Sequence, residues 1–268
     1  MKAHTSPGNF SLYWQYIRIH ARSGVQYKGW WMMLIQVIFV VFSDIISTLL
    51  MFDRFGSIGE WSVDRVLLIY FTAVTAFGLA ELFCRGFDYF PFGMVRKGEF
   101  DRVLLRPRPL TLQVAASTFH IHRLSRPLCG LGVISFLFCK HHISMNPVRL
   151  LMLLAALLGG FLMYAGIFIL TSGLSFFTIQ GIDWIYIFTN AGYQVTRCPV
   201  EYMPKALYRV FTFIIPVLVI SYYPMSVICG WGEPMWKGWL PLPTGAGFLL
   251  LAWFVWKFGV RHYKSTGS

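Results

Sequence analysis

Residues 148–171 read VRLLMLLAALLGGFLMYAGIFILT, an apolar run whose one charged residue is Arg149. As an α-helix this run would be about 36 Å long, enough to cross the roughly 30 Å hydrocarbon core of a bilayer. The sequence holds comparable runs at residues 30–52, 65–86, 124–144, 207–230 and 245–262. Together they predict an all-α polytopic membrane protein with about six transmembrane helices.

The composition excludes an ordinary soluble domain. Hydrophobic residues make up 56% of the chain and charged residues only 13%, whereas soluble domains carry about 25% charged residues. The formal net charge of +12 does not indicate nucleic-acid binding, because the Lys and Arg residues lie between the apolar runs. Basic residues in such places orient a protein in a membrane.

The positions of Lys and Arg predict that orientation. Six spans place both termini on one side, together with the Arg85–Arg126 loop and with Arg197, Lys205 and Arg209. This side then holds most of the 23 basic residues, so the positive-inside rule predicts that both termini are cytoplasmic. We therefore expect a multi-pass protein of the bacterial cell (inner) membrane.

Residues 172–195 resemble a seventh span but are interrupted by Gln180, Gly181 and Asp183. A central Asp costs about 2.5–3.5 kcal/mol on insertion. We interpret this stretch as the end of the fourth helix followed by an interfacial segment. No repeat or linker divides the chain, so residues 1–268 are expected to form a single transmembrane domain.

The first 29 residues precede the first apolar run and show no short apolar stretch of the kind found in a cleavable signal. Within them, residues 8–28 mix Tyr13 and Ile17 with Arg18 and other basic residues. Aromatic and basic side chains on one short helix suit the headgroup layer of a membrane. We predict an interfacial N-terminal helix in residues 1–29, with a plain cytoplasmic tail as the alternative.

The cytoplasmic loop at residues 87–123 contains the most informative soluble segment. Acidic residues favour a helix start near Glu99, and the prolines from Pro107 onward end it. Phe100, Val103 and Leu104 then share one face of a helix of about two turns. We expect this apolar face to project into the cytoplasm and to need a partner surface; the alternative is that the helix lies flat on the bilayer.

Three residues inside predicted spans are candidates for the translocation path. Asp44 lies in the first span, and an ionisable residue there marks a functional site by default; an interhelical hydrogen bond is the alternative. Pro216 and Pro224 lie in the fifth span, where prolines free backbone carbonyls and kink the helix; the alternative is that these are tolerated kinks packed by neighbouring helices. Glu81, near the cytoplasmic end of the second span, is expected to pair with Arg85 one turn later.

Catalytic and metal-binding patterns are weak. His120 and His122 lack further ligands at usable spacing, and no Ser-His-acid or phosphate-binding loop pattern occurs. The five cysteines have no paired spacing and are expected to be small buried thiols. We predict no catalytic site, no metal and no cofactor on this chain. If nucleotide powers its activity, the ATPase is another chain.

The sequence resembles the membrane subunits of type-2 ATP-binding-cassette (ABC) exporters, in particular a subfamily described as ABC-2 family transporter proteins. The similarity covers nearly the whole chain. It rests on the order and spacing of Gly59-Glu60-Trp61-Ser62, Arg96-Lys97-Gly98-Glu99-Phe100-Asp101, Leu104-Leu105-x-Pro107, Cys198-Pro199-Val200-Glu201, Phe213-Ile214-Ile215-Pro216, Tyr222-Tyr223-Pro224 and the tail from Trp256 to Ser268. Members commonly carry a Tyr where this chain has Cys198.

The resemblance implies a six-helix permease with an N-terminal elbow helix and a coupling helix between the second and third spans. That helix would dock on a dimer of cytoplasmic ATPase subunits, which would hold ATP and Mg. It assigns ATPase coupling to Glu99, Phe100, Asp101, Arg102, Val103, Leu104 and Arg106. It also implies a second permease subunit, the same chain or a related one in a heterodimer.

The expected function is therefore that of a permease subunit rather than an enzyme. ATP-driven closure of the partner would be transmitted through the coupling helix and would export an amphipathic small molecule, drug, peptide or lipid-linked substrate. Membrane lipid surrounds such a protein, and nucleic acid is not an expected partner. Two alternatives stay open: an integral-membrane lipid-modifying enzyme and a non-transporting assembly subunit.

Overall fold

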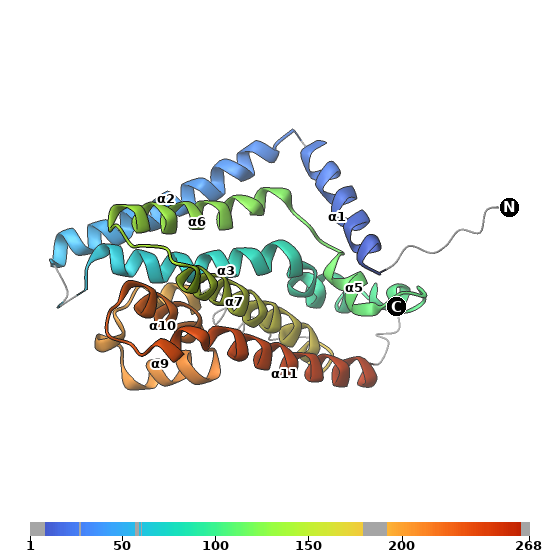
Figure 1. The fold of residues 1–268 in the computed structure, drawn as a ribbon. Helices are drawn as coiled ribbons and strands as arrows, with labels where there is room; N and C mark the ends of the chain where they lie inside the picture. The colour runs from blue at the N-terminus through green and yellow to red at the C-terminus, as the bar shows by residue number, and fades with distance from the viewer. Residues whose placement is uncertain (1–8, 27, 57–58, 60, 179–191, 264–268) are drawn as a thin grey trace.

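The computed structural model describes residues 9–26, 28–56, 59, 61–178 and 192–263 (Figure 1). This part of the chain is helical and contains no β-sheet. Its longer helices are α1 (Asn9–Gln26), α2 (Trp30–Phe55), α3 (Val63–Phe90), α6 (Ser125–Lys140), α7 (Pro147–Leu174), α10 (Val217–Cys229) and α11 (Pro241–His262). The shorter ones are α4 (Phe100–Leu104), α5 (Leu110–Ala115) and α9 (Lys205–Arg209), with 3-10 or π turns η1 (Pro91–Val95), η2 (Ile121–Leu124), η3 (Val200–Tyr202), η4 (Val210–Ile214) and η5 (Met235–Trp239).

Four of these helices, α2, α3, α7 and α11, are long and apolar enough to cross a membrane, and a bent fifth candidate runs from α9 through η4 to the end of α10. The prediction of an all-helical, multi-pass membrane protein is therefore confirmed. The third predicted span corresponds to α6, which has 16 residues and is about 24 Å long, short of the roughly 30 Å hydrocarbon core. The count of six spans stays a prediction.

The helices form a bundle with two recognisable ends (Figure 1). The α4 end, at the right of the view, holds α4, α5 and the C-terminal ends of α3 and α11; the α9 end, at the left, holds α9 and the loop between α6 and α7. Helix α3 is central, because 89% of its most apolar window is buried, whereas the corresponding figure for α2 is 11%. The bundle is thus built around α3, with α2 at its periphery.

The tightest helix pair in the bundle joins α7 and α11 through small residues. Gly159, Gly166 and Gly173 recur every seven residues on α7 and meet α11 at the backbone of Pro241, Leu249 and Trp256, respectively. A Cβ atom at Gly173 would lie 3.0 Å from the Trp256 Cα atom. Close backbone approach of this kind is how helices associate in membranes, where apolar burial alone gives little driving force.

The predicted span at residues 207–230 is broken by a sharp bend. Helix α9 and η4 run as far as Ile214, and α10 begins at Val217 with a bend of 93° between the two parts. The break falls at Pro216, which has no N–H to donate and disfavours helical geometry at the residue before it. The two parts meet through their side chains. The hydroxyls of Tyr208 in α9 and Tyr223 in α10 lie 2.9 Å apart, and the Lys237 ammonium lies 4.9 Å from the centroid of the Tyr223 ring.

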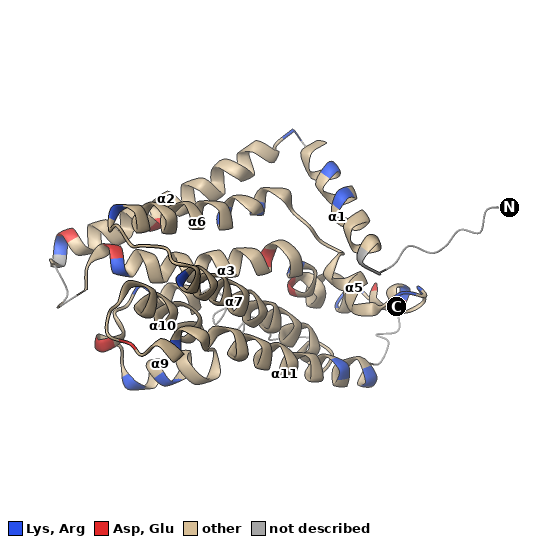
Figure 2. Cartoon of the chain, in the orientation of Figure 1, with Lys and Arg blue, Asp and Glu red and all other residues tan. Residues whose placement is uncertain are grey.

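This course also corrects the predicted positions of three basic residues. Lys205 and Arg209 lie at the α9 end, opposite the C-terminal end of α11, and not on the side assigned to the termini (Figures 1 and 2). Arg197 lies within the bundle, against Asp44 and Tyr70. Most basic residues still fall on the side of α1, α4 and the end of α11, so the charge asymmetry keeps its sign.

The stretch at residues 172–195 lies mainly outside the described residues, since 179–191 are not described. Its beginning is the end of α7, as predicted. Before the undescribed residues, the Phe177 ring stacks on Phe258 near the end of α11. After them, the Tyr193 ring packs on Tyr70 and Phe77 of α3. Tyr193 thus packs inside the bundle while Gln194 is exposed, and the interfacial segment stays a prediction.

Candidate functional site

The segment that follows α3 is folded by a proline and a glycine. Pro91 opens a π-helical turn that ends at Val95, and the chain then reverses at Gly98, whose φ of 68° lies in the left-handed region that favours glycine. Helix α4 follows at once, from Phe100 to Leu104. The predicted short helix is present, at five residues rather than two full turns.

The side chains of α4 are arranged differently from the expected exposed apolar face. Phe100 is 0% exposed and Val103 is also buried, so both pack inside the subunit. The Phe100 ring makes aromatic contacts with Phe90, Phe176 and Tyr263 at centroid distances of 5.0, 5.3 and 4.8 Å. Sequence reasoning missed these contacts, because they join residues that are far apart in the chain.

The aromatic cluster around Phe100 fixes α4 to three long helices. Phe90 belongs to α3, Phe176 follows α7, and Tyr263 follows α11. The Trp256 ring of α11 adds contacts to Phe90 and Phe176 at 5.0 and 5.4 Å. Aromatic pairs of this geometry are each worth about 0.5–1.5 kcal/mol beyond their burial, so α4 and the long helices are expected to move as one body.

The outward surface of α4 is carried by other residues. Leu104 is 46% exposed and Leu105, just after the helix, is 85% exposed. Arg102 and Arg106 are exposed beside them, as is Glu99 on the preceding turn. The exposed surface of α4 is therefore an apolar pair flanked by guanidinium groups. This composition is suited to binding a partner protein as well as to lying against lipid. Leu105 was not among the residues that the sequence indicated.

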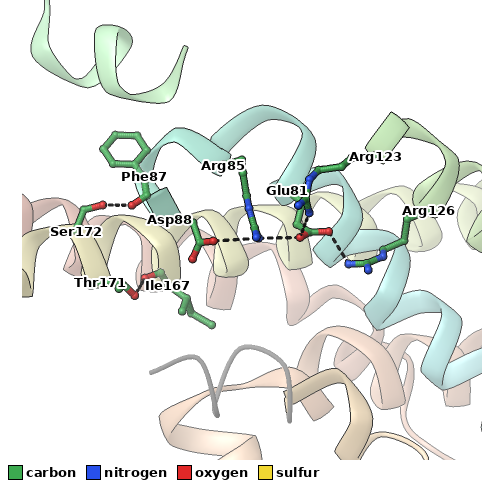
Figure 3. A network of polar contacts seen from close by, with 9 residues as sticks. All are labelled: Glu81, Arg85, Phe87, Asp88, Arg123, Arg126, Ile167, Thr171 and Ser172. Atoms are coloured by element: carbon green, nitrogen blue, oxygen red, sulfur yellow. Dashed lines mark hydrogen bonds and ion pairs between the residues drawn. The ribbon is translucent and has the colours of Figure 1, made fainter. Parts of the chain in front are cut away.

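A buried charge network lies at the C-terminal part of α3, the helix that precedes this segment (Figure 3). The Glu81 carboxylate is 4% exposed and contacts three guanidinium groups: Arg85 at 2.7 Å, Arg126 at 2.5 Å, and Arg123. Arg85 also contacts Asp88 at 3.0 Å. The predicted pairing of Glu81 with Arg85 is confirmed, and the arginines near the start of the third predicted span prove to be its further partners.

This network holds η2 and the start of α6 against α3. Three guanidinium groups face two carboxylates, so every acid in it is paired and one positive charge is in excess. Nearby, the Ser172 hydroxyl of α7 donates a hydrogen bond to the Phe87 carbonyl of α3 (Figure 3). Removing one member of a buried ion network leaves an uncompensated charge and costs several kcal/mol.

A second polar group lies deeper in the bundle, around Asp44. Its carboxylate accepts a hydrogen bond of 2.6 Å from the Tyr70 hydroxyl and forms an ion pair with Arg197. The Arg197 guanidinium also lies 4.1 Å from the centroid of the Tyr70 ring and donates to the Ser47 hydroxyl. The sequence singled out Asp44 correctly as a polar position, but its partner Arg197, 153 positions away in the chain, gave no local signal.

The two candidate prolines have different environments. Pro216 sits at the bend before α10 and lines a groove of about 590 Å³ between that bend and α11, together with Thr212, Trp236 and other mostly apolar residues. Pro224 is buried inside α10. Neither Asp44 nor Pro224 lines this groove. The three residues predicted for the translocation path therefore do not form one site in the described part of the subunit.

The cysteines and the metal-binding pattern add little. Cys139 and Cys198 are exposed, so the expectation of buried thiols is wrong for these two; the other three are partly buried. Within the described ranges, no group of three His, Cys, Asp or Glu side chains is placed to hold a metal ion.

Comparison with known proteins identifies the family. A family model described as "ABC-2 family transporter protein" matches residues 38–267. No curated protein and no solved structure matches the chain. The matched range runs from within α2 to beyond the end of α11 and includes α4, the Glu81 network and the Asp44 group. The chain therefore belongs to the ABC-2 transporter family, whose membrane proteins are the permease components of ABC transporters.

Proposed function

We propose that this chain is the permease subunit of an exporter and that the surface of α4 is where it receives the force of ATP hydrolysis. Membership of the family implies a transport subunit with an ABC ATPase as partner. The direction of transport, the contact surface and the cargo are our proposal. In it, ATP and Mg bind on the partner, and this chain supplies no catalytic group.

The observation that carries this proposal is the anchoring of α4. Leu104 and Leu105 are exposed at its surface, while Phe100 and Val103 on the same short helix are buried in the subunit. A partner that pushes on the exposed leucines therefore pushes on a body that includes the ends of α3, α7 and α11. Of the residues predicted for coupling, Glu99, Arg102, Leu104 and Arg106 face outward, and Phe100 and Val103 act as the anchor.

The part of the subunit that would move relative to this body is α2. It is peripheral, and the Asp44 ion pair with Arg197 is a partly buried polar link between α2 and the interior. We propose that cargo passes beside α2, between it and α3 and α10. The path would be lined by aromatic and apolar side chains, which suits an amphipathic small molecule, drug, peptide or lipid-linked substrate.

The proposed assembly contains two permease subunits and two ATPase subunits. The exposed apolar side chains of α2, among them Phe39 at 70% and Phe42 at 59%, face lipid or the second permease. The α4 end would face the cytoplasm of a bacterial cell, because the excess of Lys and Arg lies there (Figure 2). Both termini would then be cytoplasmic, and α1 would lie as the elbow helix at that surface.

The test is copurification of the ATPase with surface variants of the permease. We expect Leu104→Asp combined with Leu105→Asp to abolish copurification and transport, because a carboxylate at each position removes the apolar contact and adds desolvation cost. The matched control is Met235→Asp, which changes a residue that is 60% exposed in η5, at the α9 end. It should copurify like the unchanged protein.

Phe100→Asp is not a suitable probe, because it would place a charge in the buried aromatic cluster and destabilise the subunit itself. Membrane insertion and size-exclusion profiles should be normal for the leucine variants. An ATPase that copurifies equally with the double leucine variant and with the methionine variant would refute the assignment of α4 as the contact.

A further inference from the structure

A polar cavity that the ATPase contact does not use lies where α1 meets α2. Its volume is about 640 Å³. The walls come from α1, the start of α2, Tyr89 at the end of α3, and the segment from Ser117 to Arg123. It therefore sits at the α4 end, at the depth where an interfacial helix joins a spanning helix and where lipid headgroups lie.

The polar side chains of this cavity are suited to an anion. Three imidazoles, from His20, His120 and His122, line it together with Arg123 and hydroxyl groups. None of its lining residues in the described chain is acidic. The His120 and His122 rings stack at 5.4 Å, and no hydrogen bond joins a ring nitrogen of either to the described residues. Two unused imidazole edges therefore remain available to a ligand.

The remaining wall of the cavity is apolar. Trp30, Met33, Phe119 and Ile121 line it, and Met33, which is 40% exposed, continues into the lipid-facing side of α2. A molecule with a charged group and an apolar tail could therefore place its headgroup among the imidazoles and its tail along α2. A free anion would leave the apolar wall unused.

We propose that this cavity binds the phosphate of an amphipathic molecule, a phospholipid headgroup in the first place, with His120 and His122 as its donors. The proposal concerns a site distinct from the ATPase contact and from the Asp44 group. It holds whether or not α4 docks on an ATPase. A headgroup bound there would join α1 to the segment at Ser117–Arg123 and so fix the angle of α1 against the bundle.

Binding should be linked to proton uptake. Burial, followed by the charge of Arg123, lowers the pKa of His120 to about 4 in the empty cavity, and the same two causes lower the pKa of His122. The negative charge of a bound phosphate would raise the pKa values of both imidazoles. The imidazoles should therefore gain protons on binding, and affinity should rise as the pH falls. The other titratable or charged groups around these rings are His20 of α1, Arg85, Glu81 and Tyr89 of α3, and Arg123 of η2.

The experiment uses the purified full chain in detergent with short-chain lipids as probes. Dihexanoyl phosphatidylglycerol, dihexanoylglycerol and inorganic phosphate are titrated by calorimetry at pH 7.5 and at pH 5.5. We expect phosphatidylglycerol to bind more tightly than either other probe, and more tightly at the lower pH. His120→Gln with His122→Gln should weaken its binding about tenfold and remove the pH dependence.

Two variants control for loss of structure. His262→Gln removes an exposed imidazole at the end of α11 and should bind as the unchanged protein does. Gly24→Leu should block the cavity without damaging α1, because a Cβ there meets only Ile121 at 3.8 Å and leucine favours helix more than glycine. Equal binding by the double histidine variant or by Gly24→Leu would overturn the site. Equal affinity for inorganic phosphate and phosphatidylglycerol would overturn the amphipathic ligand.

Discussion

Two helices of the bundle are held in opposite ways. Helix α11 lies against α7 through matched glycines, so that the two backbones touch along their length. Helix α2 is largely exposed, and Asp44, paired with Tyr70 and Arg197, is its partly buried polar link to the interior. Two helices whose backbones touch have one arrangement, because any shift of one helix along the other creates clashes. A helix held by an ion pair can move if the charged side chains exchange partners.

This difference suggests a division of labour. The α7–α11 pair ends in the aromatic cluster around Phe100 and belongs to the body that α4 would move. Helix α2 borders the proposed path and, in this proposal, is the element that moves. The substitutions below test the contrast, beginning with the largest expected effect.

Filling the glycine interface should be the most damaging change. A side chain at Gly159 would overlap the backbone of Pro241, so Gly159→Leu should destabilise the subunit by about 3 kcal/mol or more and leave little folded protein. Fluorescence-detected size exclusion would measure the yield. Gly247→Leu is the control, since a Cβ on this α11 glycine meets nothing within 4 Å. Equal yields of the two variants would show that α7 and α11 do not pack this way.

Removing the charge of Asp44 should have the next largest effect. Asp44→Asn can keep the hydrogen bond from Tyr70 but leaves the Arg197 guanidinium without its carboxylate, at a cost of about 2 kcal/mol. We expect a lower thermal midpoint and faster hydrogen exchange in α2. Asp53→Asn, an exposed acid on the same helix, is the control. The double variant with Arg197→Gln should recover part of the loss, and strict additivity would exclude a direct pairing.

The shape of the Arg197 guanidinium should matter less than its charge. Arg197→Lys keeps the ion pair but loses the stacking of the planar group, which lies 4.1 Å from the Tyr70 ring centroid. The expected cost is about 1 kcal/mol, seen as a smaller fall in the thermal midpoint than that of Asp44→Asn. A fall as large as that of the Asp44 variant would show that the ring contact, not the charge, fixes α2.

The outer face of α2 should be the most tolerant. Phe39 is 70% exposed in the subunit, so Phe39→Ala should change the free energy of unfolding of the isolated subunit by about 0.5 kcal/mol or less, with little shift in its thermal midpoint. A loss comparable to that of Asp44→Asn would mean that this face is covered within the subunit. Copurification of a differently tagged second permease would then show whether the same change weakens the assembly.

The parts of the fold that the sequence could predict are those decided by local composition. The apolar runs at 30–52, 65–86, 148–171 and 245–262 correspond to α2, α3, α7 and α11, with ends that differ by a few residues. Length and hydrophobicity decide such helices, and neither depends on tertiary contacts.

The errors arose where distant contacts decide the structure. Pro216 was expected to kink a spanning helix, but the chain turns through 93° there, and beyond the bend α10 packs on the distant helices α3 and α7. Phe100 fell on an amphipathic face that could equally point outward or inward, and Phe176 and Tyr263 bury it. Arg197 was counted as a surface charge, since nothing near it in sequence reveals Asp44.

The central claim, that α4 contacts the ATPase, is tested most directly by photo-crosslinking in native membranes. A benzophenone amino acid replaces Leu105, which is 85% exposed, and in a parallel sample replaces Met235 at the α9 end. The account predicts a covalent product of this chain with an ATP-hydrolysing subunit from position 105 and none from position 235. Crosslinks from position 105 to lipid alone would contradict it.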